Sequence, residues 1–370
     1  MPTDKRVNYW DYIRVDDLLD LQGGVEGDEA GLANDEVMFI VVHQVYELWF
    51  KLIKRELMTA RDLFNKGPVA EQALSGAVHS LRRVGVILER CVDHFQVMET
   101  LATREYLAFR DKLMPASGFQ SAQLREIEIL LGLKDGDRLS LGVEGDYMQA
   151  LRSHDGAEST AFRRVEETRA SGPSLLEVVE EWLYRTPIDG LGPADEGAEE
   201  ALDRFIERYL DAVNGEIDSS LEMALSRSHT EEDQATLRQR YARERESQAA
   251  FLQPSEADGG RRRSRIRASI LFIWTYPELP LLSWPRELLD QLIALEQVFV
   301  VFRQRHARMV ERVIGRRTGT GGSAGVDYLD ETALRYRVFR DVWACRTCQI
   351  REAAAPALER PEFYGFVSAD

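Results

Sequence analysis

Apolar residues recur at three- and four-residue steps through most of the chain, which is the period of amphipathic helices. The pattern is clearest between Pro285 and Gly325, where one helical face carries Phe299, Phe302, His306, Met309, Val310 and Val313. Pro285 suits the first turn of this helix, and Gly315 suits its end. One histidine therefore lies on an otherwise apolar stripe, just before the glycine-rich loop TGTGGSAG. The spacing alone leaves two interpretations open, a hydrogen-bonded core histidine and a metal or haem ligand.

Further helical patterns lie on both sides of this segment. The stretch from Val37 to about Phe64 begins apolar on almost every side, as expected of a buried helix. Residues 72–114 predict a second long helix, and residues 266–281 predict a buried helix that prolines end. The segment after Gly325 predicts one more amphipathic helix. Because no strand-like alternation of convincing length is present, the chain is predicted to be all-α.

The middle of the chain, at about 136–262, is predicted to be an additional helical insert. It mixes helical patches with loops rich in Gly, Asp and Pro, and it contains the highly charged run HTEEDQATLRQRYARERESQAA. Such a run is typical of a solvated helix or of one arm of a helical hairpin. We therefore expect residues 1–30 to form an N-terminal arm and residues 31–370 to form a single helical domain that includes this insert.

Composition narrows the classes of function. The chain has 370 residues, of which 44% are hydrophobic, and 63 acidic residues outnumber 47 basic ones to give a net charge of −16. This balance argues against nucleic acid as a partner, because binding to phosphates needs clustered Lys and Arg. No apolar run approaches the ~20 residues of a membrane span. The first residues lack an apolar signal region, so we expect a cytoplasmic protein without a membrane partner.

The three cysteines, Cys91, Cys345 and Cys348, are too few for a disulfide framework. The last two form a CxxC motif, but no histidine follows it, and no second CxxC could complete a zinc site. We interpret them as packing residues. The motifs GxSxG, HExxH and a strand-linked GxGxxG are also missing from the sequence.

Five segments make the sequence similar to the tryptophan 2,3-dioxygenase family over most of its length. They are YWDYIRVDDLL, NDEVMFIVVHQVYELWFK, YLAFRDKLMPASGFQS, LLEVVEEWLYRTP, and the His306 helix with GTGGSAG. The resemblance implies an all-α helical bundle that encloses a b-type haem, ferrous when active. It also implies insertion of dioxygen across the indole C2–C3 bond of L-tryptophan, which gives N-formylkynurenine in the kynurenine pathway of tryptophan degradation.

The resemblance also implies roles for individual residues. His306 matches the proximal ligand of the haem iron, and Ser117 and Gly118 match a turn near the haem and the substrate. The positions that match the family's substrate contacts are Phe39, His43, Tyr106, Arg110 and Thr320. In that family the histidine accepts the indole N–H, so His43 would orient the substrate. An arginine fork suits a carboxylate because it offers two parallel donors to two oxygens.

The N-terminal arm carries an unusual density of aromatic residues for a chain end. Termini fray unless something holds them, so this arm is expected to dock, either on its own subunit or elsewhere. The resemblance implies that it crosses to a neighbouring subunit of a homotetramer. Tyr9, Tyr12 and Ile13 would then help to wall the neighbour's substrate pocket.

Several positions near the expected haem depart from the family pattern. The family usually has histidine where Asn34 stands, and some members have tryptophan at Phe95. Phe302, Gln304 and Arg305 also differ from the usual residues before the proximal ligand. Two alternatives therefore accompany the dioxygenase interpretation. One is a family relative that acts on a modified indole in a biosynthetic pathway, for instance as a monooxygenase. The other is a non-catalytic haem-binding sensor or scaffold, which would need no clamp for an amino acid.

Overall fold

The computed structural model describes residues 8–67, 69, 71–113, 121–139, 148, 151–152, 156–317 and 325–365. Its α-helices are α1 (Tyr9–Tyr12), α2 (Val15–Leu19), α3 (Asn34–Phe64), α4 (Glu71–Met98), α5 (Thr103–Phe109), α6 (Ala122–Leu131), α8 (Thr160–Ala170), α9 (Leu175–Arg185), α10 (Ala198–Ser226), α11 (Glu231–Leu252), α12 (Gly260–Thr275), α13 (Ser283–Ile314), α14 (Val326–Arg335) and α15 (Arg340–Thr347). These described residues form no β-strand, so the all-α prediction is confirmed.

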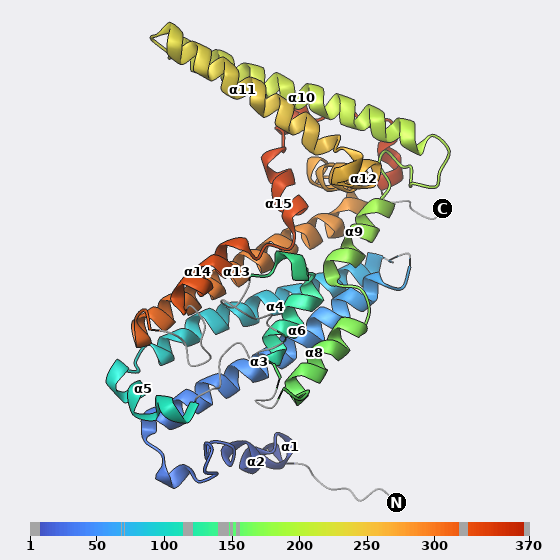
Figure 1. The fold of residues 1–370 in the computed structure, drawn as a ribbon. Helices are drawn as coiled ribbons and strands as arrows, with labels where there is room; N and C mark the ends of the chain where they lie inside the picture. Colours follow the sequence, from blue (N-terminus) through green and yellow to red (C-terminus); the bar gives the residue numbers. More distant parts are fainter. Residues whose placement is uncertain are drawn as a thin grey trace, which may run out of the picture.

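Three long helices form the centre of the body. α4 packs against both α3 and α13, while α14 lies along α13, α6 lies on α3 and α8 lies on α6 (Figure 1). Ile53, Leu88 and Leu292, one from each central helix, are at most 1% exposed. Burying an aliphatic side chain of this size contributes about 1.5–3 kcal/mol, so this three-helix contact is a major source of stability.

The limits of α13 follow from the residues at its two ends, as predicted. Pro285 lies buried in the first turn, where its missing N–H has no intrahelical partner to lose. Gly315 follows the last helical residue with a φ of +64°, a conformation that favours glycine. The helix therefore ends directly before the glycine-rich loop.

Two of the predicted helices are divided in the structure. The stretch 72–114 is α4, a turn, α5 and a short 3-10 helix, Arg110–Leu113. At the turn, the hydroxyl of Thr100 donates to the Val97 carbonyl over 2.7 Å, and α5 then packs back on α3 and α13. No glycine or proline marks this break, so the sequence pattern did not reveal it.

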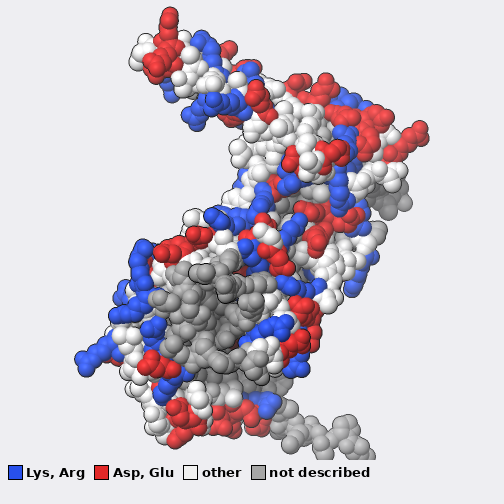
Figure 2. All heavy atoms as spheres, in the orientation of Figure 1, with Lys and Arg blue, Asp and Glu red and all other residues white. Residues whose placement is uncertain are grey.

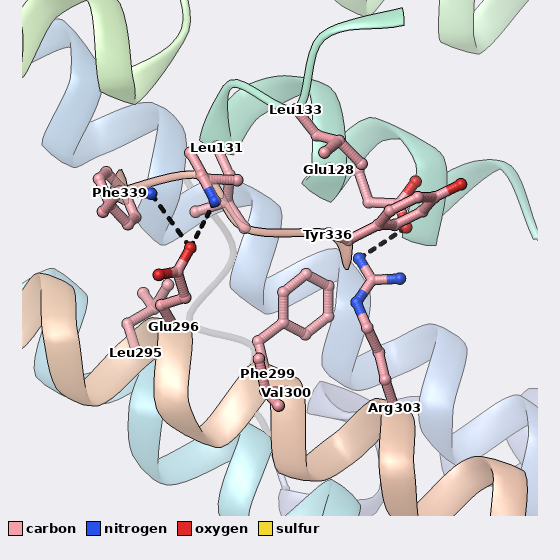
Figure 3. A pocket seen from close by; sticks show the side chains of 11 residues that line it. Glu128, Leu131, Leu133, Leu295, Glu296, Phe299, Val300, Arg303, Tyr336 and Phe339 are labelled. Carbon is pink, nitrogen blue, oxygen red and sulfur yellow. Dashed lines mark hydrogen bonds and ion pairs between the residues drawn. The ribbon is translucent and has the colours of Figure 1, made fainter. Parts of the chain in front are cut away.

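The tail after Gly325 is likewise two helices, α14 and α15. Between them, a carboxylate oxygen of Glu296 on α13 accepts hydrogen bonds from the backbone N–H groups of Val338 and Phe339 (Figure 3). The Glu296 side chain is buried, so these charge-assisted bonds form away from water and are the strong kind. They hold residues 336–339 against α13 and interrupt the predicted continuous helix.

The charged helices α10 and α11 form an antiparallel hairpin that projects from the body (Figure 1). Only Gln248 and Leu252 of α11 are buried, which agrees with the predicted hairpin arm. Acidic and basic side chains are interspersed over the hairpin and the body (Figure 2). At the opposite end of the molecule, α1 and α2 run below α3, and neither helix has a buried residue.

Candidate functional site

His306 lies on α13 at the face that meets α4. Its ring stacks on the Phe95 ring of α4, with centroids 5.6 Å apart and planes inclined by 12°, and on Phe302 of its own helix at 6.4 Å. Burial, followed by electrostatic interactions with His43 and two nearby arginines, lowers the pKa of His306 to about 4. The imidazole is therefore neutral at pH 7, and one of its nitrogens keeps a lone pair that can bind a metal.

His43 lies on α3 with its ring 4.1 Å from the ring of Phe39, one helical turn earlier. Its Nδ1 is 2.7 Å from the Phe39 carbonyl oxygen. Because a carbonyl can only accept, Nδ1 carries the proton and Nε2 is the free acceptor of the neutral ring. Desolvation lowers the pKa of His43, although the Phe39 carbonyl and the charge of Glu47 oppose the shift. Interaction with His43 is in turn one of the causes that lower the pKa of His306.

The His43 ring is accessible to solvent and yet closely surrounded by protein, because it lines a deep groove. The groove has a volume of about 920 Å³ and follows α3 from Glu36 to Met58. Phe39, Ile40 and His43 lie on its wall. Another side is formed by the end of α2 and the loop after it, through Leu18, Leu21, Gly24 and Val25. Its size is at the upper end of the range of small-molecule sites.

α5 brings more aromatic side chains to Phe39. The rings of Tyr106 and Phe109 are 6.2 and 5.5 Å from the Phe39 ring, and both residues are buried. Burial raises the pKa of Tyr106, while the charge of Arg110 one turn later opposes this rise. The structure thus brings together Phe39, His43, Tyr106 and Arg110, four of the residues singled out in the sequence.

The aromatic residues of the arm do not reach this cluster in their own chain. Tyr9 and Tyr12 on α1 are 75% and 78% exposed, and Ile13 is 43% exposed. The arm is tied to α3 further along, where the Gln22 amide donates to Gln44 over 2.7 Å. The other predicted site residues, Ser117, Gly118 and Thr320, lie outside the described residues.

Two residues of this region were missed in the sequence. Phe109 completes the aromatic wall, and its spacing from Tyr106 could have revealed it. His94 on α4 lies with its ring 5.1 Å from the ring of Tyr46, and its Nε2 is buried without a hydrogen-bond partner among the described residues. An electrostatic interaction with His94 is among the causes that lower the pKa of His43. The sequence did not reveal the position of His94, because a single histidine in a helical pattern does not indicate which residues it contacts.

A family model for tryptophan 2,3-dioxygenase matches residues 3–349. A tryptophan 2,3-dioxygenase of Sorangium cellulosum is 54% identical over 367 residues, which cover 98% of this chain and 88% of that protein. A protein of Ralstonia nicotianae named tryptophan 2,3-dioxygenase 2 is 50% identical over 98% of both chains. A tryptophan 2,3-dioxygenase-like protein of Xanthomonas campestris is 49% identical over 72% of this chain.

The chain belongs to the tryptophan 2,3-dioxygenase family. Tryptophan 2,3-dioxygenases depend on haem, and the chemistry around His306 fits that cofactor. The described residues contain no cluster of three or more His, Cys, Asp or Glu side chains that could hold a bare metal ion. A neutral histidine between aromatic rings can instead supply one axial ligand to an iron whose other ligands come from a porphyrin.

Two further predictions concern the cysteines and membrane spans. Cys345 and Cys348 are buried, and both thiols donate to backbone carbonyls, as expected of packing residues. None of the helices in the described part of the chain is long and apolar enough to cross a membrane.

The three arginines that flank His306 form ion pairs with carboxylates of the protein. Arg303 binds Glu128 of α6 over 2.8 Å, and Arg305 binds Glu99 over 2.9 Å. Arg308 pairs with Asp330 and Glu311, and it lies near the surface. The sequence would also allow these arginines as partners of haem propionates, because they flank His306. In the structure each of them is instead paired with a carboxylate.

Proposed function

We propose that this chain is a haem-dependent tryptophan 2,3-dioxygenase that converts L-tryptophan and dioxygen to N-formylkynurenine. The observation that carries the proposal is the pair of neutral imidazoles, His306 and His43, in a chain that matches the family model over residues 3–349. His306 would hold the iron of a haem b through its free nitrogen. Haem, when bound, supplies the iron chemistry that activates dioxygen.

The residues of the chain would bind and orient the indole. With Nδ1–H donated to the Phe39 carbonyl, the Nε2 of His43 can accept the indole N–H. Phe39 and Tyr106 would wall the ring, and the Arg110 fork would bind the substrate carboxylate. His43 then needs to take up no proton during the reaction, which makes it an orienting partner.

The roles of the residues outside the described segments are part of the same proposal. Thr320 would contact the ammonium or carboxylate group of the substrate, and Ser117 and Gly118 would approach the haem and the substrate. These three roles rest on the match of the residues to the family motifs.

We further propose that the protein is a homotetramer in which the arm of one subunit completes the pocket of another. The exposed aromatic residues Tyr9 and Tyr12 support this, because large apolar surface left in water favours association. Deleting residues 1–13 should then raise KM for tryptophan while haem content stays close to that of the full chain. A full-length chain that is fully active as a monomer would contradict this part of the proposal.

The reaction is tested by product mass under ¹⁸O₂. Purified protein with ferrous haem and L-tryptophan should give a product that carries two labelled oxygen atoms and an opened indole ring. A single labelled oxygen with the ring intact, or turnover of methylated indoles only, would support a specialist monooxygenase instead. Haem binding without any turnover of indoles would support a sensor. The family match and the clustered substrate-side residues favour the dioxygenase over both.

The cofactor assignment needs its own measurement. His306→Ala should lose most of the bound haem, or else the ferrous spectrum of a five-coordinate histidine complex. His79→Ala, on the exposed side of α4, is a matched control that removes a histidine remote from His306 and should leave the spectrum unchanged. An unchanged ferrous spectrum in His306→Ala would rule out this residue as the ligand.

A further inference from the structure

Arg303 lies one helical turn before His306 on α13, on the side that faces α6 and residues 336–339. Its guanidinium is 4.4 Å from the centre of the Phe299 ring and 4.8 Å from that of Tyr336, and its Nη2 donates to Glu128 over 2.8 Å (Figure 3). Arg303 is 9% exposed and Glu128 is 1% exposed. The side chain is thus fixed on three sides, by two rings and a carboxylate.

Glu128 is the centre of a larger charge cluster. Arg125 donates to it over 2.9 Å, and Arg138 donates to the same carboxylate oxygen. These positive charges keep the pKa of the Glu128 carboxyl well below its usual range, although burial opposes the shift. The ion pair of Arg303 and Glu128 is therefore charged at neutral pH.

Buried charges act on their surroundings more strongly than charges on the surface. In water, dissolved ions screen a surface charge within about 10 Å, whereas the protein interior weakens a charge much less. Arg303 precedes His306 by three residues on α13, which makes the two side chains neighbours on one helix surface. The buried guanidinium charge therefore acts electrostatically on the imidazole. The same charge must disfavour any additional positive charge on a group bound to that imidazole.

We propose that Arg303, held in place by Glu128, is a positioning residue for His306 and raises the reduction potential of the haem that this histidine holds. The inference rests on the proposed function, because it takes His306 as the iron ligand. The step concerned is a one-electron reduction in which ferric iron takes an electron from an external reductant such as dithionite and becomes ferrous. A fixed positive charge nearby favours the product, since ferrous iron carries one positive charge less.

The rigid setting of Arg303 matters for this role. Residues 336–339 are bound to α13 by Glu296, so the Tyr336 ring stays over the guanidinium (Figure 3). A flexible arginine would exchange between the site and solvent, and its average effect on the iron would be smaller. Because the guanidinium is clamped, its charge remains at one place relative to His306 when the iron changes its oxidation state.

The test is a spectroelectrochemical titration of the haem-loaded protein. Arg303→Met, which keeps the length of the side chain and loses its charge, should shift the midpoint potential downwards. Arg303→Lys should stay close to the parent protein, because it retains the charge. Glu128→Gln should shift the potential upwards, and the double variant with Arg303→Met should move back towards the parent value. Phe299→Leu is the control, since it loosens the same packing without a change of charge.

Opposite shifts for Arg303→Met and Glu128→Gln cannot arise from loosened packing, which would move both variants in the same direction. If Glu128→Gln does not fold, the midpoint potentials of Arg303→Met and Arg303→Lys are sufficient to test the inference. An unchanged potential in Arg303→Met, or an equal shift in Arg303→Lys, would overturn the inference. The proposed function would survive that result as long as haem still binds through His306. If haem binds equally well to His306→Ala, both the proposed function and the inference on Arg303 are overturned.

Discussion

Removing the Nε2 acceptor of His43 should lower activity selectively towards substrates that carry an indole N–H. The 2.7 Å contact between Nδ1 and the Phe39 carbonyl leaves Nε2 as the only acceptor on the ring. In His43→Phe the ring volume stays similar, but the indole N–H of tryptophan enters a pocket without a partner. An unpaired buried donor costs about 1–3 kcal/mol. Because about 1.4 kcal/mol corresponds to a factor of ten, kcat/KM should fall roughly 5- to 150-fold.

The assay compares tryptophan with 1-methyltryptophan, which has no indole N–H. His43→Phe should lower kcat/KM for tryptophan and leave that for 1-methyltryptophan unchanged or improved. Phe39→Leu is the control, because it removes a packing surface that both substrates use and should weaken both alike. An equal loss for both substrates in His43→Phe would refute the reasoning, since His43 would then act through packing alone.

Three further predictions concern binding, stability and pH. Arg110→Met should weaken binding of L-tryptophan by about 2–4 kcal/mol and that of tryptamine, which lacks the carboxylate, much less; isothermal titration with both ligands checks this. Arg265 is 1% exposed and donates to the carbonyls of Tyr184 and Leu191, each over 2.9 Å. Arg265→Met should therefore lower the free energy of unfolding, measured in urea, by about 2–5 kcal/mol, and a change below about 1 kcal/mol would contradict this. In the folded haem-free chain the pKa of His306 is lowered to about 4, whereas in the unfolded chain it is about 6.5. Between these two pH values the unfolded chain binds a proton at His306 and the folded chain does not. Stability from this residue is complete above that window and is lost on acidification, so the advantage of the parent protein over His306→Gln in urea should shrink from pH 7 to pH 4.5.

The sequence predicted those features that depend on neighbours along the chain. Pro285 and Gly315 marked the ends of α13 because their backbone preferences act locally. Phe39 and His43 were expected together because a helix places residues four apart on one face, and their rings are 4.1 Å apart. In both cases the physical cause lies within one helix, where periodicity and capping carry the information.

Features that depend on distant partners were not visible in the sequence. The break between α14 and α15 is held by Glu296, which is 42 residues before Val338. The ion pair of Arg303 and Glu128 joins residues 175 positions apart. In the sequence Arg303 was one of three arginines that flank His306, and nothing there pointed to Glu128. Such contacts form only after α6 and α13 have packed, and residue types alone do not select one carboxylate among 63 acidic residues.

The two sides of the site differ in what encloses them, and this difference bears on how a substrate enters. The His306 side is closed by Phe95 and Phe302 from the central helices and by the buried ion pair of Arg303 with Glu128 of α6. The His43 side opens into the groove of about 920 Å³ along α3. A pocket that must exclude water during oxygen chemistry cannot remain open on one side. In the proposed homotetramer, the exposed aromatic arm of a second subunit would cover this side, so subunit assembly and substrate enclosure would be one event.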